Sequence, residues 1–457
     1  MRGERLFPSL SLPTSSAMVV SRGRNPSAAE ILSQVFQSKG LRDRVLTTLG
    51  LLLLVRLGIY VPVPGIDRAA FQGFLQQGGQ LLNFLDIFTG GGLSTLGVFA
   101  LGILPFINAS IILQLLTAAL PQLEDLQKNE GEAGRRRIAQ ITRYVALGWG
   151  VIQSVVFSMI LRQYKIAEIP DWQFVLQTSL ALVAGSMVVM WISEVITERG
   201  IGQGGSLVIF LNIVATLPRA LGSTIELAQS GDRATVGGIA ILVLVFLVTI
   251  VGIIFVQEGN RRIPIVSAKR QVGGGAGMLT SRQNYLPLKL NAGGVMPIIF
   301  ASAVVFLPLT IANLTRNATL VQVAGYLSPN SSIPWLYALV YFLLICGFGF
   351  FYASLTVNPV DIATNLKRTG VAIPGVRPGS ATANYLTGVQ NRLTLLGGIF
   401  LGAVAIIPSA VEGAIQVRTF QGLGATSLLI LVGVAIDTAK QVQTFVISQR
   451  YEGMVRR

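Results

Sequence analysis

The chain has 457 residues, of which 52% are hydrophobic and only 12% are charged. Soluble proteins carry roughly 25% charged residues, so this composition excludes an ordinary soluble domain and indicates a membrane protein. Histidine is absent and Cys346 is the single cysteine, which excludes a Ser-His-Asp triad, an internal disulfide and a clustered zinc site. We therefore expect no catalytic residue, no metal and no cofactor.

Ten apolar segments in the chain approach the roughly 20 residues that a membrane-spanning helix needs. In chain order they are Val45–Val61, Val98–Leu116, Ala139–Leu161, Phe174–Ile196, Ser206–Leu221, Val236–Val256, Ala292–Asn313, Trp335–Thr356, Leu393–Val411 and Gly424–Val446. The expected fold class is an all-α membrane protein with ten transmembrane helices.

The net charge of +15 is unevenly distributed around these segments. If both termini are cytoplasmic, 27 Lys and Arg residues lie on the cytoplasmic side and 7 on the other side. Cytoplasmic loops of membrane proteins are enriched in Lys and Arg, so we predict that both termini are cytoplasmic.

Residues 1–44 precede the first apolar segment. Met1–Ser16 contains Arg and Ser with little acid, as in a transit segment; alternatively Met18 is the true start, which we favour. Ala28–Arg44 is expected to form an amphipathic helix at the membrane interface, with Ile31 and Val35 on its apolar face.

Two interruptions stand out in and around the second span. Gly90, Gly91 and Gly92 break the apolar run Leu81–Leu96, which is either a movable re-entrant segment or an external interfacial helix with a flexible turn. Composition alone favours the second. In the span that follows we expect Pro105 to kink the helix, because it lacks an N–H.

A glycine-rich segment, Thr197–Ser206, separates the fourth and fifth spans. A phosphate-binding GxGxxG needs a preceding strand, and none is expected here, so a hinge between helices is the better interpretation. Near the C-terminus, Asp437 and Lys440 are spaced i,i+3 and are expected to pair.

Two long basic loops, Gln257–Leu290 and Asn358–Arg392, lie on the predicted cytoplasmic side. They either fix the topology and contact anionic lipid or form a docking platform for a large acidic or nucleic-acid-containing partner. The middle of the predicted membrane region is nearly bare of ionisable residues, which disfavours an ion-coupled solute carrier. A scaffold for membrane complexes is a further alternative.

Seven motifs carry a family resemblance. They are VPVPGID at 61–67, FALGILPFINASIILQLL at 99–116, GEAGRRRIAQITRY at 131–144, ITERGIGQGGS at 196–206, LPLKLNAGGVMPIIFAS at 286–302, NPVDIATNLKRTGVAIPGVRPG at 358–379 and TSLLILVG at 426–433. Over about residues 28–455 the chain resembles the SecY family, the pore-forming subunits of bacterial and plastid protein translocases.

The resemblance implies two inverted five-helix halves around an hourglass pore. The N-terminal half would be residues 45–226 and the C-terminal half residues 227–446, with a cytoplasmic tail at 447–457. Such a channel passes unfolded secretory proteins across the membrane, releases hydrophobic segments laterally into it, and is not an enzyme. The membrane would be a plasma or thylakoid membrane, with both termini cytoplasmic or stromal.

The resemblance also assigns site residues. Residues 81–96 correspond to the family's plug, which fills the external funnel of the idle channel, and its centre comprises Phe88, Gly90, Gly91, Gly92 and Leu93. The pore ring falls on Ile103, Ile107, Gly205, Ile209, Ile299 and Ile430. Gly205 departs from the bulky residue expected there, so the ring is either incomplete or filled by a neighbour such as Leu207. The lateral gate includes Asn108, Gln114 and Asn291.

The two basic loops correspond to the family's docking sites for the SecA motor and the ribosome. The residues expected to make these contacts are Arg261, Arg262, Lys269, Arg270, Lys367, Arg368 and Arg377. Further implied partners are SecE-like and SecG-like subunits, signal peptides, unfolded preproteins and membrane lipid.

Overall fold

The computed structural model describes residues 38–67, 70–71, 73, 86, 89–128, 131–163, 166, 170–230, 233–267, 284–315, 319, 322, 325–326, 333–415 and 425–455. Its helices are α2 (Lys39–Gly58), α5 (Gly92–Thr95), α6 (Leu104–Ala119), α7 (Pro121–Lys128), α8 (Gly131–Gln163), α9 (Asp171–Arg199), α10 (Gly204–Ser230), α11 (Arg233–Glu258), α12 (Met296–Thr315), α14 (Pro334–Thr356), α15 (Pro359–Arg368), α16 (Ser380–Ile415) and α17 (Ala425–Val455). Three strands, β1 (Asn260–Ser267), β2 (Asn284–Lys289) and β3 (Val371–Ala372), form one sheet in the order β2-β1-β3. Most of the predicted N-terminal amphipathic helix lies outside the described residues.

Each of the ten predicted spans overlaps a different helix: α2, α6, α8, α9, α10, α11, α12, α14, α16 or α17. Within the described residues, six helical stretches are long and apolar enough to cross a membrane: Gly131–Arg162, Asp171–Arg199, Val236–Glu258, Pro334–Arg368, Ser380–Pro408 and Thr426–Ser448. Helices α8 and α16 begin well before the predicted spans, because their first turns are polar and carry no apolar signal.

The second predicted span begins later than expected. Residues Val98–Ile103 form turns, and α6 begins only at Leu104. Pro105 therefore lies in the first turn of α6, where an N–H would have no intrahelical partner in any case. The predicted kink is wrong, because this proline starts the helix and does not interrupt it.

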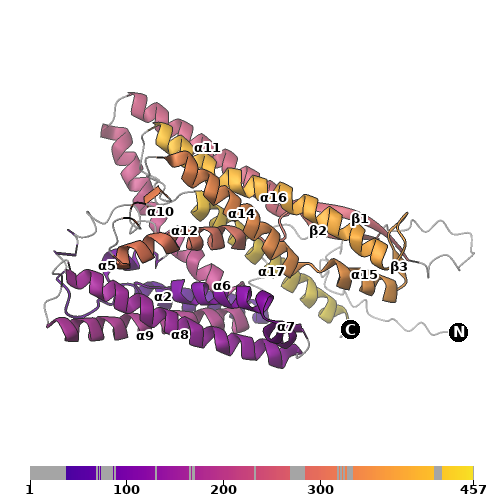
Figure 1. Cartoon of the computed structure of the whole chain (residues 1–457), viewed down its shortest axis with the longest axis horizontal. Helices are drawn as coiled ribbons and strands as arrows, with labels where there is room; N and C mark the ends of the chain where they lie inside the picture. Colours follow the sequence, from indigo (N-terminus) through magenta and orange to yellow (C-terminus); the bar gives the residue numbers. More distant parts are fainter. Residues whose placement is uncertain are drawn as a thin grey trace, which may run out of the picture.

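The helices pack as two groups (Figure 1). Helices α2, α6, α8, α9 and α10 pack among themselves, and so do α11, α12, α14, α16 and α17. Among the described residues the main contacts between the groups are made by α10, with α17 and with α11. Helix α6 has little direct contact with α12 or α14, so the two groups are joined on one side and only loosely packed on the other.

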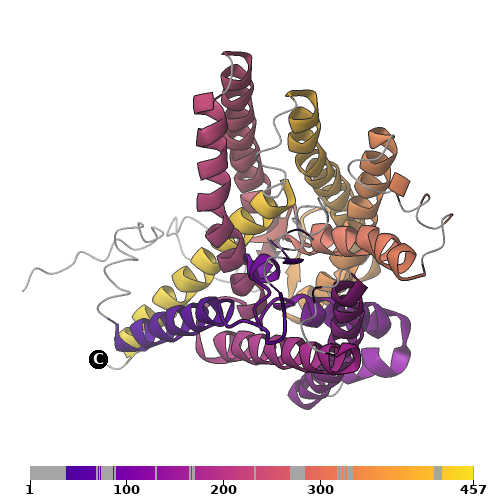
Figure 2. The same cartoon turned by 90° about the vertical axis from the view of Figure 1, so that its left-hand side faces the viewer.

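The polar elements gather at one end of the molecule. In Figure 1, α7, α15 and the three strands lie toward the right, whereas the short helix α5 lies toward the left. Figure 2, which faces that left-hand side, shows α5 (violet) near the middle of the surrounding helices. The end that holds the strands carries the two basic loops, and the opposite end holds the broken glycine segment.

Candidate functional site

The centre of the molecule is a cluster of apolar side chains contributed by both groups of helices. Ile103, Ile209, Ile299 and Ile430 are all buried in it, with exposed fractions of 0%, 3%, 8% and 0%. Ile107 is partly buried and packs against the same cluster. These five isoleucines come from the start of α6, from α10, from α12 and from α17, and we call them the isoleucine cluster. They belong to a larger apolar cluster to which further helices contribute.

Gly205 lies at the start of α10, beside one member of the isoleucine cluster. A Cβ atom built on Gly205 would lie 3.5 Å from Cδ1 of Ile103. Leu207 is buried, but its Cδ1 would lie 2.6 Å from a Cβ built on Gly202, in the turn before α10. This geometry places Ile103 beside Gly205 and Leu207 beside Gly202, and the choice between an incomplete ring and one filled by Leu207 stays a prediction.

The glycine segment, residues 89–97, forms a compact turn around a single helical turn, α5. Gly90 and Gly91 have φ angles of +69° and +87°, a region that favours glycine. Asp86 organises the turn, because its carbonyl accepts from Gly91 N at 2.9 Å and its Oδ1 accepts from Ser94 N at 2.7 Å. Leu93 is buried beneath it. Residues 87 and 88, with the predicted plug residue Phe88, lie outside the described residues.

This segment lies directly beside the isoleucine cluster. Cα of Thr89 would lie 3.8 Å from a Cβ built on Gly102, the residue before Ile103. Gly92 packs on the turn before α6, where an added Cβ would lie 3.2 Å from the carbonyl oxygen of Phe99. The glycine segment therefore covers the side of the cluster at the start of α6, away from the strands.

The predicted gate residues lie in two segments and make local hydrogen bonds. Gln114 Nε2 donates to Ser110 Oγ at 3.2 Å, one turn earlier on α6. Asn291 is buried, and its Nδ2 donates to the carbonyl of Gly294 at 2.7 Å, which shapes the turn before α12. Asn108 is partly buried on α6. The bond of Gln114 lies within α6, and the bond of Asn291 lies within the turn before α12. Neither joins α6 to α12, in keeping with the sparse packing between these two helices.

The two basic loops, predicted separately, meet in the three-stranded sheet. Strand β1 pairs antiparallel with β2 from the same loop, and Val266 pairs with Ala372 of β3 from the other loop. Ile263 and Leu288 are buried in a cluster with Leu386 of α16. The sheet therefore fixes both loops on the same end of α16 as one unit.

Five of the predicted contact residues lie exposed on this unit. We call them the basic surface: Arg261, Arg262, Lys367, Arg368 and Arg377. The guanidinium of Arg262 lies 4.9 Å from the ring centroid of Tyr285, a cation–π contact that orients it. Lys269 and Arg270 lie outside the described residues.

Arg377 directly follows a tight turn, residues 373–376, and precedes α16. Val376 N donates to Ile373 O at 3.1 Å and Gly375 has a φ of +79°, as a type II turn requires. The carbonyl of Arg377 accepts from Thr382 Oγ1 at 2.8 Å. The backbone of Arg377 is thus fixed, while its side chain is exposed to solvent.

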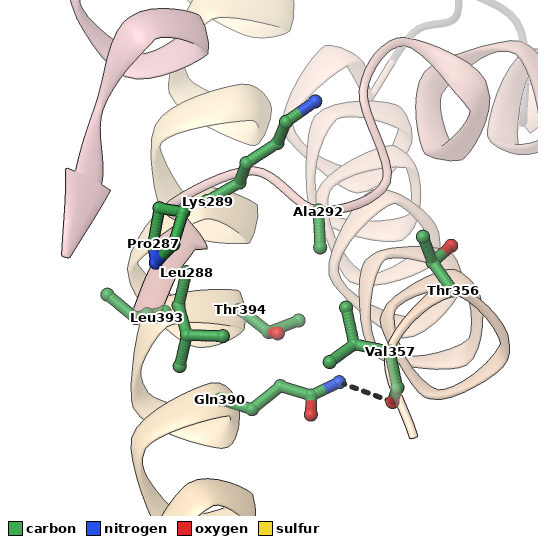
Figure 3. Close-up of a pocket in the computed structure, with 9 residues that line it drawn as sticks. All are labelled: Pro287, Leu288, Lys289, Ala292, Thr356, Val357, Gln390, Leu393 and Thr394. Carbon is green, nitrogen blue, oxygen red and sulfur yellow. Dashed lines mark hydrogen bonds between the residues drawn. The ribbon is translucent and has the colours of Figure 1, made fainter. Parts of the chain in front are cut away.

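A pocket of about 260 Å³ lies where β2, α14 and α16 meet (Figure 3). Gln390 of α16 reaches across it, and its Nε2 donates to the carbonyls of Ala353 at 2.8 Å and Val357 at 3.3 Å. The carbonyl of Ala353 also accepts from Val357 N at 3.1 Å, and Val357 is the C-cap residue of α14, so Gln390 caps α14 from a neighbouring helix. These bonds hold the end of α14 against the helix that supports the basic surface.

The predicted hinge at Thr197–Ser206 is held by both groups of helices. Ile201 N donates to Thr48 Oγ1 of α2 at 3.0 Å, and Gly202 N donates to Gln441 Oε1 of α17 at 2.8 Å. The backbone of this segment is therefore anchored from two sides. Sequence reasoning missed this anchoring because the partners are distant along the chain.

Lys440 and Arg56 are two further residues whose partners the sequence did not reveal. Lys440 Nζ pairs with Glu258 Oε1 of α11 at 2.8 Å, whereas the sequence pointed to Asp437. Arg56 of α2 donates from Nη1 to the carbonyl of Gly90 in the glycine segment. A signal for Arg56 existed, because it is the one basic residue inside the first predicted span.

Comparison with known proteins agrees with the resemblance seen in the motifs. A sequence profile of the SecY family matches residues 97–439. The protein translocase subunit SecY of Synechococcus elongatus is 67% identical over 442 residues, covering 96% of this chain and 100% of the relative. The protein of the same name from Porphyra purpurea is 52% identical over 422 residues, covering 92% and 100%.

Solved structures share the fold at low sequence identity. A structure described as that of a protein conducting channel has a TM-score of 0.63 at 19% identity, covering 91% of this chain and 96% of that one. Sec61 in a canine ribosome–channel complex from the endoplasmic reticulum has a TM-score of 0.60 at 18% identity, covering 91% and 96%. The family profile, the close relatives and the shared fold together show that this chain belongs to the SecY family.

Proposed function

We propose that this chain is the conducting subunit of a protein-translocating channel in the membrane. The observation that carries the proposal is the isoleucine cluster, built from four helices, with the glycine segment packed directly on it. An apolar constriction excludes ions by dewetting, and side chains that interact only by packing can part around a passing polypeptide. A solute carrier would instead need polar groups at this place to bind its substrate.

The two groups of helices would act as the two halves of the channel, residues 45–226 and 227–446. Their contacts concentrate on α10, whereas α6 and α12 are loosely packed against each other. A lateral gate near Asn108, Gln114 and Asn291 can then open without breaking a large interface. Opening there would admit signal peptides and release hydrophobic segments into lipid.

The basic surface would dock the partner that drives transport, either a SecA-type motor or the ribosome. Its exposed Arg and Lys side chains favour acidic protein or RNA phosphate, and a relative of the same fold occurs in a ribosome–channel complex. The family further suggests SecE-like and SecG-like subunits. With the basic surface in the cytoplasm or stroma, both termini lie there too, and the membrane is a plasma or thylakoid membrane.

The test uses proteoliposomes that contain the chain with a SecE-type partner, SecA, ATP and a signal-bearing preprotein. We expect the preprotein to become protected from added protease only when ATP is present. Lack of protection in folded, correctly oriented protein, beside a working positive control, would refute the conducting function.

A further inference from the structure

Arg56 occupies an unusual place for a charged residue. It is the third residue from the end of α2, it is partly buried, and it follows the apolar run LLLLV at 51–55. A charged side chain in such a segment needs partners, because its desolvation is costly. The guanidinium lies 5.8 Å from the ring centroid of Tyr60 and donates through Nη1 to the carbonyl of Gly90.

Gly90 is clamped between two helices at this point. A Cβ built on Gly90 would lie 2.6 Å from Oδ1 of Asn212 on α10 and 3.0 Å from Nη1 of Arg56 on α2. Gly90 has a φ of +69°, a conformation that residues with side chains rarely adopt, and its carbonyl accepts from Arg56. One end of the glycine segment is thus held by one charged hydrogen bond and close packing.

The other end of the glycine segment is bonded to the chain that follows α2. Val63 N donates to Leu96 O at 3.1 Å, and Val98 N donates to Val61 O at 2.8 Å. Thr95 Oγ1 donates to the carbonyl of Ile59 at 3.2 Å. We call residues 95–98 the root. The root makes two backbone hydrogen bonds and one side-chain hydrogen bond to the chain that follows α2. The Gly90 end makes one hydrogen bond to Arg56.

We propose that Arg56 is a positioning residue that latches the glycine segment over the resting channel. Release of the segment would break the bond from Arg56 to Gly90, while the root stays in place. This proposal rests on the proposed function, since it assigns the plug of that channel its latch. The alternative is that Arg56 only complements the carbonyls at the end of α2, where a cation is favourable.

The experiment measures ion leak through the resting channel, reconstituted with a SecE-type partner in planar bilayers. Four channels are compared: the parent, Arg56→Gln, Arg56→Lys and the control Arg162→Gln. Arg162 pairs with Asp171 at 2.7 Å on the external side, so the control removes a charge without touching the segment. Each substitution is also made in a channel that lacks Leu82–Ser94.

We expect Arg56→Gln to raise the leak about tenfold, because a hydrogen bond to a charged group is lost. Arg56→Lys should have an intermediate effect, since lysine keeps the charge but not the planar fork; it also serves as the probe if Arg56→Gln folds poorly. Arg162→Gln should leave the leak unchanged. In the deleted channel Arg56→Gln should add nothing, because its target is gone.

The outcomes separate the latch from the channel itself. A tight Arg56→Gln channel beside a leaky deletion would overturn the latch but keep the plug. An additive effect of Arg56→Gln in the deleted channel would show that Arg56 acts on the pore or the fold, which also overturns the latch. A tight deleted channel would remove the plug assignment, and the latch would fall with it.

Discussion

Gln441 on α17 accepts a hydrogen bond from the backbone N–H of Gly202 at 2.8 Å, across the boundary between the two groups of helices. Gly202 has a φ of +86° and lies in the turn that leads into α10. Helix α10 carries Gly205 and Ile209, and α17 carries Ile430. The bond therefore sets the start of α10 against α17, so the segment predicted as a hinge is anchored to both groups.

Replacing Gln441 by Leu should lower the free energy of unfolding by about 1 kcal/mol, because the N–H of Gly202 loses its acceptor. Gln441→Glu keeps an acceptor oxygen and should stay close to the parent. The measurement is thermal unfolding of the purified complex in detergent. Gln443→Leu is the matched control, since a residue two positions on points to another side of the helix. Equal melting temperatures for Gln441→Leu and the parent would show that this bond contributes nothing.

Two adjacent glycines at the start of α10 should respond in opposite ways to alanine. Gly205→Ala places its methyl group 3.5 Å from Ile103, an ordinary contact, and gains about 0.5–1 kcal/mol of helix stability. Gly204→Ala would place a Cβ 1.8 Å from the carbonyl oxygen of Ser193 and should be strongly destabilising. Melting temperatures of the two variants give the comparison. A destabilised Gly205→Ala variant would mean that the space beside Ile103 is already filled.

Reversing the charge of Arg377 should reduce transport driven by SecA or by the ribosome while leaving membrane insertion intact. The side chain is exposed and its backbone is fixed, so Arg377→Glu should change the basic surface and not the fold. Transport kinetics in inverted vesicles provide the readout. Arg135→Glu is the control, because Arg135 is exposed on α8 and the main contacts of α8 are with α6, α7 and α9, not with the strands. Unchanged kinetics for Arg377→Glu would remove Arg377 from the docking site.

Whether the protein stays folded after a deletion in the plug should depend on the last residue that is removed. Removal of Leu82–Ser94 spares the root and should raise ion leak while transport continues. Removal of Leu82–Leu96 also takes away the carbonyl that Val63 binds, so it should lower the yield of folded protein. Size-exclusion profiles and leak measurements on both deletions provide the comparison. Equal folding of the two deleted proteins would show that the root is dispensable.

Apolar runs revealed the helices, because a spanning helix leaves an unbroken signal about 20 residues long. They could not reveal the polar first turns of α8 and α16, or the turns at 98–103 that delay α6 until Leu104. Pro105 was read as a kink because a sequence does not show whether a proline stands inside a helix or at its start.

The contacts that the sequence did not reveal are those between distant segments. The three-stranded sheet joins two loops separated by two spans, and prolines at positions 264 and 287 weaken its strand signal. Nothing in the sequence pairs Arg56 with Gly90 or Gln441 with Gly202, because these partners are distant along the chain. Ring positions on α6, α10, α12 and α17 were assigned by family resemblance, because isoleucine in a membrane helix carries no signal of its own.

If the isoleucine cluster is the constriction of the channel, a polypeptide in transit must pass through it. The most direct test places a photo-crosslinking amino acid at Ile299, in the cluster, or at Leu244, which is 62% exposed on α11. A preprotein is then arrested in transit by a folded domain at its end. We expect cross-links to the preprotein from position 299 and none from position 244. Absence of cross-links from position 299, with an arrested and protease-protected preprotein, would contradict this expectation.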